Sequence, residues 1–122
     1  MSLNSTIRSA IMPLVSICVP DLYTPGKAPA ASEYCTFQYS ELPACFGDDA
    51  PASIRYLGQL HWYLPWKDKK GAAINPLPKK KKIRQALFHA GCTFPDVTNA
   101  SDEVSQHYVF EFEYIEGVDE DG

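Results

Sequence analysis

The chain has 122 residues, of which 45% are hydrophobic and 21% are charged, and this is typical of one globular domain with a single core. No apolar run approaches the roughly 20 residues that span a bilayer. The first 20 residues carry one arginine, and Pro13 and polar residues interrupt their apolar stretch, unlike a signal peptide. We therefore expect a cytosolic protein with no membrane partner. The net charge of −4 excludes a protein whose whole surface is built to bind nucleic acid.

The N-terminal region predicts a short helix that Asn4 or Ser5 can cap. Apolar residues recur there at helical spacing, at Ile7, Ile11, Leu14 and Val15. Because Pro13 lacks a backbone N–H, we expect the helix to end near Met12 and residues 14–19 to be extended. The prolines and the glycine within residues 20–32 predict a proline-rich arm.

Two strands are predicted after the arm. Aromatic and β-branched residues at 34–39 favour a strand, and the prolines and the glycine within residues 40–53 favour a turn. In residues 54–64 apolar positions recur at every second residue, which predicts a strand that ends at Pro65. One face of this strand, which includes Gly58, is apolar, and the other face is mixed. The apolar face carries Ile54, Tyr56, Leu60, Trp62 and Leu64, and the mixed face carries Arg55, Leu57, Gln59, His61 and Tyr63.

A basic loop leads to a second helix that is expected to begin near Pro78 and to end at Gly91. Its inward stripe is Ile83, Ala86, Leu87 and Ala90. A loop with a short strand near its start follows, then a strand over 106–115 with four aromatic residues on one face, Tyr108, Phe110, Phe112 and Tyr114, and an acidic tail over 116–122. The order helix, strand, strand, helix, strand predicts one α+β domain over 1–122, an antiparallel sheet with helices packed on one face.

Charge is unevenly distributed along the chain. Eight of the eleven Lys and Arg lie within 67–84, and nine of the fifteen Asp and Glu lie from residue 96 onward. Two interpretations are open: two solvated faces of one monomer, or two surfaces through which copies of the chain contact each other. The candidate residues are Lys67, Lys69, Lys70, Lys79, Lys80, Lys81 and Lys82 on the basic side, and Glu111, Glu113, Glu116 and Asp119 on the acidic side.

The lysines are also the only sign of nucleic-acid binding, because Trp62, Tyr63 and Trp66 lie near them in the sequence. They could form a sequence-independent patch for phosphates. The four consecutive lysines oppose the dipole of the helix that they begin, so they do not stabilise it. This conflict favours a partner for them outside their own helix.

Few residues could carry chemistry. His61 and His107 become neighbours if their strands pair, and with Glu111 or Glu113 they could form a metal or acid–base set. His89 and Cys92 supply only two ligands. The four cysteines lack C-x-x-C spacing, so free thiols are expected, and a nucleophilic pair is conceivable only among Cys35, Cys45, His61 and His107. Motifs for nucleotide binding and serine hydrolysis are absent, so we expect no catalytic residue, no metal and no cofactor.

Four segments together resemble a known family: YCTFQYSELPACFGDDAP (34–51), IRYLGQLHWYLP (54–65), KKKKIRQALFHAGCTFP (79–95) and HYVFEFEYIEGVD (107–119), preceded by PDLYTPG (20–26). They are similar to the tail-terminator, or tail-completion, proteins of tailed phages and prophages, which are often labelled minor tail or minor capsid components. The resemblance covers most of the chain beyond residue 15.

The resemblance implies a structural virion assembly protein with an α+β fold and no enzymatic activity. Such a subunit forms a homo-oligomeric ring, a hexamer, at the head-proximal end of the tail. It ends the growth of the tail tube and joins it to the head connector, after assembly in the host cytoplasm. The candidate lysines would then line either the subunit interface or the lumen through which DNA passes. Two alternatives remain: a head–tail connector or head-completion subunit, and a small metal-binding or hydrolytic domain that uses His61 and His107.

Overall fold

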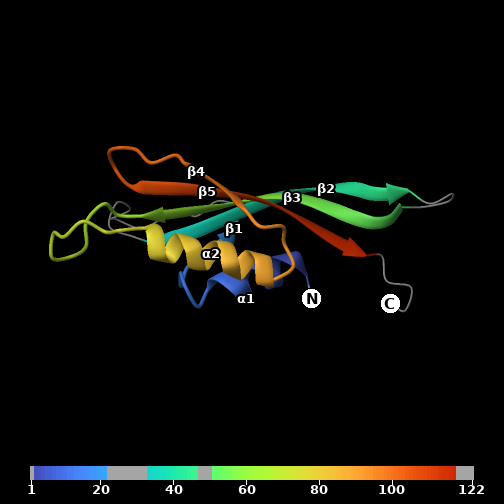
Figure 1. The fold of residues 1–122 in the computed structure, drawn as a ribbon, viewed down its shortest axis with the longest axis horizontal. Helices are drawn as coiled ribbons and strands as arrows, with labels where there is room; N and C mark the ends of the chain where they lie inside the picture. Colours follow the sequence, from blue (N-terminus) through green and yellow to red (C-terminus); the bar gives the residue numbers. More distant parts are fainter. Residues whose placement is uncertain (1, 22–32, 47–50, 118–122) are drawn as a thin grey trace.

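The computed structural model describes residues 2–21, 33–46 and 51–117, with the backbone alone at 42–46, 51–53 and 116–117. Two helices and five strands follow one another as α1 (Leu3–Ile11), β1 (Cys18–Pro20), β2 (Tyr34–Phe46), β3 (Pro51–Leu64), α2 (Leu77–His89), β4 (Asp96–Asn99) and β5 (Gln106–Gly117). The strands form one sheet in the order β1-β2-β3-β5-β4. Both helices lie on the same side of this sheet (Figure 1), which confirms the predicted α+β class.

Strand pairing is antiparallel except at one edge, where β1 runs parallel to β2. The short strand expected after the second helix is β4. Strand β1 is shorter than the extended segment predicted over 14–19, because the N–H groups of Leu14 and Val15 turn back to the carbonyl of Ile11, at 2.8 and 2.9 Å. Helix α1 ends at Ile11, as Pro13 predicted, but its cap is Ser2, whose hydroxyl accepts from the Ser5 N–H.

The long hairpin of β2 and β3 corrects the turn predicted over 40–53. Strand β2 continues to Phe46 and β3 begins at Pro51. Register shifts on both sides of Cys45 accommodate the irregular pairing beyond Pro43, as a β-bulge does. The acidic tail predicted from 116 is also partly wrong, since Glu116 and Gly117 pair with β3 as the end of β5. Residues 22–32 of the predicted arm and 118–122 of the tail lie outside the described residues, and Pro20 belongs to β1.

The core lies between the sheet and the helices. The predicted apolar faces of β3 and β5 point there, and the most deeply buried side chains are Ile7, Ile11, Phe37, Leu60, Trp62, Ile83, Leu87 and Phe110. Helix α2 begins one residue before Pro78 and stops as predicted, with Gly91 in the left-handed region at φ +105°. Neither described helix has the length and apolarity that a membrane crossing requires.

Candidate functional site

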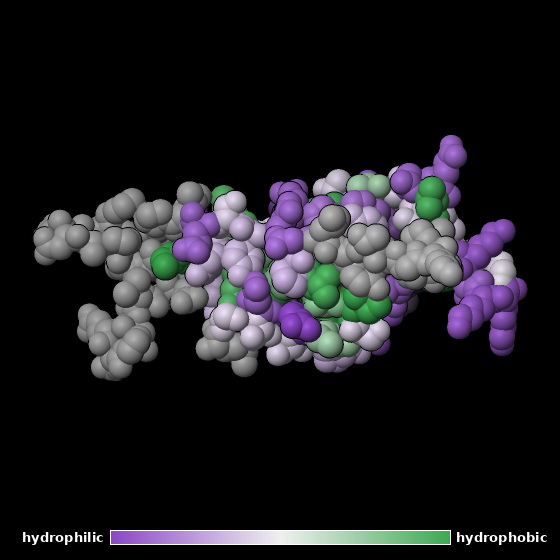
Figure 2. Space-filling model, turned by 180° about the vertical axis from the view of Figure 1, so that it is seen from behind, coloured by the Kyte–Doolittle hydropathy of each residue, from purple (hydrophilic) through white to green (hydrophobic). Residues whose placement is uncertain are grey.

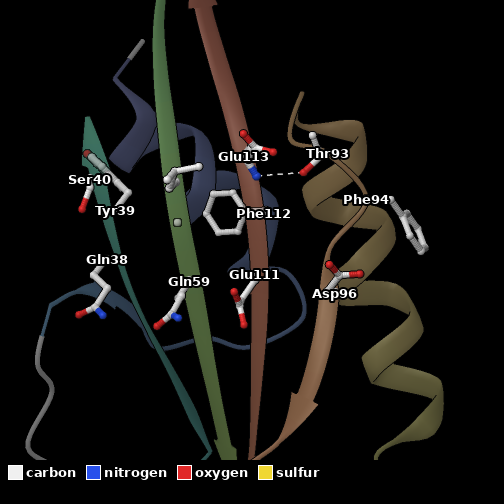
Figure 3. Close-up of a pocket in the computed structure, with 12 residues that line it drawn as sticks. Gln38, Tyr39, Ser40, Gln59, Thr93, Phe94, Asp96, Glu111, Phe112 and Glu113 are labelled. Carbon is white, nitrogen blue, oxygen red and sulfur yellow. Dashed lines mark hydrogen bonds between the residues drawn. The ribbon is translucent and has the colours of Figure 1, made fainter. Parts of the chain in front are cut away.

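The side of the sheet opposite the helices is the candidate site, and we call it the open face. Because side chains alternate along a strand, the residues between the core positions point to this side. Figure 3 views it with α1 and α2 behind the strands. No described helix covers it. From β2, β3 and β5 it presents Tyr34, Thr36, Gln38, Ser40, Arg55, Leu57, Gln59, His61, Tyr63, His107, Val109, Glu111, Glu113 and Ile115.

A ladder of rings crosses one end of the open face. Tyr63 stacks on Tyr34 with centroids 4.7 Å apart and on His107 with centroids 4.1 Å apart. Both flat faces of Tyr63 are therefore occupied by neighbouring rings. Binding of single-stranded nucleic acid to a sheet needs exposed ring faces on which bases can stack. Trp62 is buried in the core, so neither Tyr63 nor Trp62 offers a free ring face to a base, whereas Trp66 is 43% exposed.

His61 and His107 are neighbours, as the sequence predicted. Nδ1 of His61 lies 2.9 Å from Nε2 of His107, so one ring donates to the other. Burial lowers the pKa of His61. Burial also lowers the pKa of His107, the nearby His61 lowers it further, and Asp102 opposes this shift. The pair is consequently held in its neutral form near neutral pH.

The metal site that this pair could have formed is not found among the described residues. Within residues 2–21, 33–41, 54–115 and the other described positions, no three His, Cys, Asp or Glu side chains are grouped so that they could hold a metal ion. Glu113 instead forms an ion pair with Arg55, with Nε and Oε1 3.5 Å apart. His89, at the end of α2, is exposed, while Cys92 is buried.

The described cysteines are poor candidates for nucleophiles. Cys18, Cys35 and Cys92 are free and buried. Burial raises the pKa of Cys18 and of Cys92 to about 12, and burial likewise raises the pKa of Cys35 well above its usual value. A thiol is reactive as the thiolate, so these three are inert near neutral pH. Cys35 pairs with Trp62 on the core side, away from His61, and the side chain of Cys45 lies outside the described residues.

A groove of about 700 Å³ crosses the middle of the open face. Four polar side chains form a row across it, because the register places Gln38 beside Gln59, Gln59 beside Glu111, and Glu111 beside Asp96 (Figure 3). The groove is also lined by Tyr39, Ser40, Leu57, Gly58, Thr93, Phe94, Phe112 and Glu113. We call this the open-face groove.

Of the residues that line the groove, only Glu111 and Glu113 were among the contact candidates predicted from the sequence, although Leu57 and Gln59 were placed on this side of their strand. Asp96 joins because the Thr93 N–H donates to the Glu113 carbonyl, and the Glu113 N–H donates to the Thr93 hydroxyl, which aligns the start of β4 with β5. Continuing the alternation of β2 past residue 39 would have placed Gln38 and Ser40 on this side of the sheet. The prolines within residues 40–53 favoured a turn instead. Of the other candidate acids, the side chain of Glu116 and the whole of Asp119 lie outside the described residues.

The candidate lysines gather at one end of the molecule. Lys67, Lys69 and Lys70 lie on a loop between β3 and α2, and Lys79–Lys82 form the first turns of α2 beside it (Figure 1). Strongly hydrophilic side chains collect at the same end in the space-filling view (Figure 2). We call residues 66–74 the basic hairpin, since Lys67 bridges to Ala73 and the Ile74 N–H donates to the Trp66 carbonyl at 2.9 Å.

Two of the lysines are engaged inside the molecule. Nζ of Lys79 lies 3.1 Å from both carboxylate oxygens of Glu33, which also accepts from the Trp62 indole N–H at 2.9 Å. Nζ of Lys80 lies 4.5 Å from the centre of the Tyr108 ring. Lys67, Lys69, Lys70, Lys81 and Lys82 are exposed. Lys79 and Lys80 therefore have partners within the chain, and the other five form no ion pair within the described residues.

No protein-family model matches this chain, and no curated protein matches it.

Proposed function

We propose that this chain is a structural subunit of a phage or prophage tail, of the tail-terminator kind, that acts by forming a ring of identical copies. The observation that carries this proposal is the separation of its charges. The exposed lysines lie at one end, while Asp96 and Glu111 lie in the open-face groove. Within the described residues the only ion pairs are Arg55–Glu113 and Lys79–Glu33. Most of the opposite charges are therefore left for contacts with other molecules.

This separation suits a ring. In a closed ring each subunit uses one patch to contact a different patch of the next subunit. Two surfaces of opposite charge attract each other across such a contact, while like patches repel and so oppose the wrong pairing. The resemblance of four segments to tail-completion proteins supports the same function from the sequence.

The mechanism of the proposed function is geometric. A ring that sits on the polymerising end of the tail tube occupies the edge to which the next tube subunit would add. The opposite side of the ring presents a different surface to the head connector. No bond is made or broken in this mechanism.

The proposed function is tested by mixing the purified protein with tail tubes and viewing the tube ends by negative-stain microscopy. We expect rings at one end of the tubes and tubes that stop growing. In solution, the mass from light scattering should fall as salt is added, because salt screens exposed charges. A protein that binds the head connector and never the tube would favour the connector alternative. A protein that forms no ring under any of these conditions would contradict the proposal.

A variant pair makes this test specific. Lys81→Glu with Lys82→Glu reverses two exposed charges of α2 without touching the Lys79–Glu33 pair. We expect fewer rings at low salt and an unchanged fold by circular dichroism. Lys81→Arg with Lys82→Arg keeps the charges and is the matched control, which should assemble as the natural chain does.

A further inference from the structure

We propose that the open-face groove of one copy binds the basic hairpin of the next copy. This inference rests on the proposed function, since it requires that copies of the chain assemble, and it adds which two surfaces meet. The groove contributes carboxylates, amides and two apolar side chains. The hairpin contributes three lysines and an exposed tryptophan.

The groove carries negative charge that no ion pair with another described residue neutralises. Asp96 and Glu111 are directly opposite each other in the β4–β5 register, and like charges in that position destabilise a sheet. Neither forms an ion pair with a described residue. Arg55, on the same face, is already paired with Glu113. A cation from another molecule would relieve this repulsion, so the groove favours a basic partner.

The rim of the groove adds apolar surface. Leu57 is 41% exposed and Phe94 is 52% exposed. Figure 3 shows the Phe94 ring turned outward from the row of polar side chains, where Arg84 lies 4.5 Å from its centre. Aromatic and arginine side chains are the residues that most often supply the binding energy of protein interfaces. A partner here would meet both charge and apolar contact.

The basic hairpin is held in one shape before it binds anything. The Asp68 carboxylate accepts from the N–H groups of Lys70 and Ala72, at 2.8 and 3.0 Å. Gly71 supplies the left-handed conformation of the turn at φ +85°. At the base, the buried Gln106 amide donates to the carbonyls of Pro65 and Ile74. A preformed loop loses little conformational freedom when it docks.

The hairpin also carries an anchor for an apolar rim. Trp66 is 43% exposed, and its indole N–H donates to the Asp102 carbonyl at 2.7 Å, which fixes the ring beside the lysines. Its exposed surface matches the apolar rim that Leu57 and Phe94 provide, while the lysines match Asp96 and Glu111. The two surfaces are therefore complementary in both charge and polarity.

The hairpin cannot reach the groove of its own chain. It follows the end of β3 at one end of the molecule (Figure 1), whereas the groove residues Leu57 and Gln59 lie in the middle of β3. The contact must then join two copies through different surfaces. Such a contact continues from copy to copy, and it forms a ring when the rotation between neighbouring copies closes on itself.

The experiment compares charge reversals on the two sides of the sheet, in the full chain and in the presence of tail tubes. Asp96→Lys with Glu111→Lys changes the groove. Glu41→Lys changes another exposed acid, on β2, that points to the other side, since its register partner is the core residue Tyr56. We expect the groove variant to raise the concentration needed for ring formation about tenfold or more, and the Glu41 control to leave it within about threefold.

The hairpin variant supplies the second half of the cycle. Lys69→Glu with Lys70→Glu should impair assembly as the groove variant does. Mixing the groove variant with the hairpin variant should restore rings in which the two alternate. In half of the contacts a natural hairpin meets a natural groove, and in the other half the reversed hairpin meets the reversed groove, so every contact joins opposite charges. Combining all four substitutions in one chain should restore assembly to within about tenfold of the natural chain. Urea unfolding of each variant checks that the fold is retained.

Failure of this inference differs from failure of the proposed function. Natural rings from the folded groove and hairpin variants would overturn the docking of hairpin into groove and leave the ring intact. A hairpin variant that assembles normally but no longer retains double-stranded DNA would assign the lysines to DNA, and would overturn the inference as well. A natural chain that forms no rings on tubes would overturn both.

Discussion

The two faces of the sheet use the same strands for different purposes. On the helix side Trp62, Phe37, Leu60 and Phe110 are fully buried. On the open face most residues are polar or ring-bearing, apart from Leu57, Val109 and Ile115, and all but the buried Thr36 are at least partly exposed. The strand period of two makes this possible, since neighbouring residues point to opposite sides. Most side chains on the helix side pack in the core, so the open face is the part of the sheet that is available to contact another molecule.

The difference between the faces is largest at two adjacent residues of β5. Phe110→Ala on the helix side should lower the free energy of unfolding by about 3–5 kcal/mol, because it leaves a cavity in a fully buried position. Glu111→Ala on the open face should change it by less than about 0.5 kcal/mol. Urea unfolding followed by circular dichroism measures both. Equal losses at the two positions would mean that the open face is packed as tightly as the core.

If Phe110→Ala does not fold, Phe110→Leu keeps the comparison measurable. It retains apolar contact and should be less destabilising than the alanine variant, yet still clearly more so than Glu111→Ala. The order of the three variants, rather than any single value, then tests the division between the faces.

A second test concerns the point where the core face of β3 has no side chain. Gly58 lies under the Phe112 ring, and a Cβ there would come within 2.5 Å of Cζ and 2.7 Å of Cε2. Gly58→Ala should therefore cost about 1–3 kcal/mol, since the ring must move from its packed position. Thermal unfolding measures the loss. The double variant Gly58→Ala/Phe112→Leu removes the ring that clashes and should lose less than the sum of the two single variants.

The strands were predicted most accurately where apolar and polar residues alternate most regularly. Residues 54–64 and 106–115 alternate without interruption, and both strands and both faces were predicted correctly. The hairpin beyond residue 40 was mistaken for a turn because Pro43 and Pro51 argue against strands locally, while pairing with β3 and β5 overrides that preference. The cap of α1 was misplaced by two or three residues, because Ser2, Asn4 and Ser5 are all good capping residues close together in the sequence.

The candidate site was predictable only where it depended on alternation within one strand. His61 and His107 were placed on the same side correctly, and pairing of β3 with β5 brought them together. The groove needed Asp96, whose position depends on the register of a four-residue edge strand that hydrogen bonds of Thr93 align. The engagement of Lys79 with Glu33 was also beyond sequence analysis, because the two are 46 residues apart.

The histidine pair gives the smallest effect and a direct probe of the open face. Burial lowers the pKa of both rings in the folded chain, so the unfolded chain binds more protons between its ordinary histidine pKa of about 6.5 and the lower folded values. The contribution of the neutral pair to the free energy of unfolding is therefore complete above about pH 6.5, and it is lost as the pH falls through the folded pKa values. We expect a loss of less than about 1 kcal/mol, since both rings are partly solvated and screened.

Urea unfolding at about pH 7.5 and about pH 5 measures this contribution. The variant His61→Gln/His107→Gln should show a smaller drop in stability between the two pH values than the natural chain. His89→Gln, at the exposed end of α2, is the matched control and should keep the natural drop. A drop that is unchanged in the double variant would show that the two rings are as open to solvent in the folded chain as in the unfolded one. The side chains of the open face would then be packed even more loosely than the stacked rings indicate, and the contrast with the helix side would be larger.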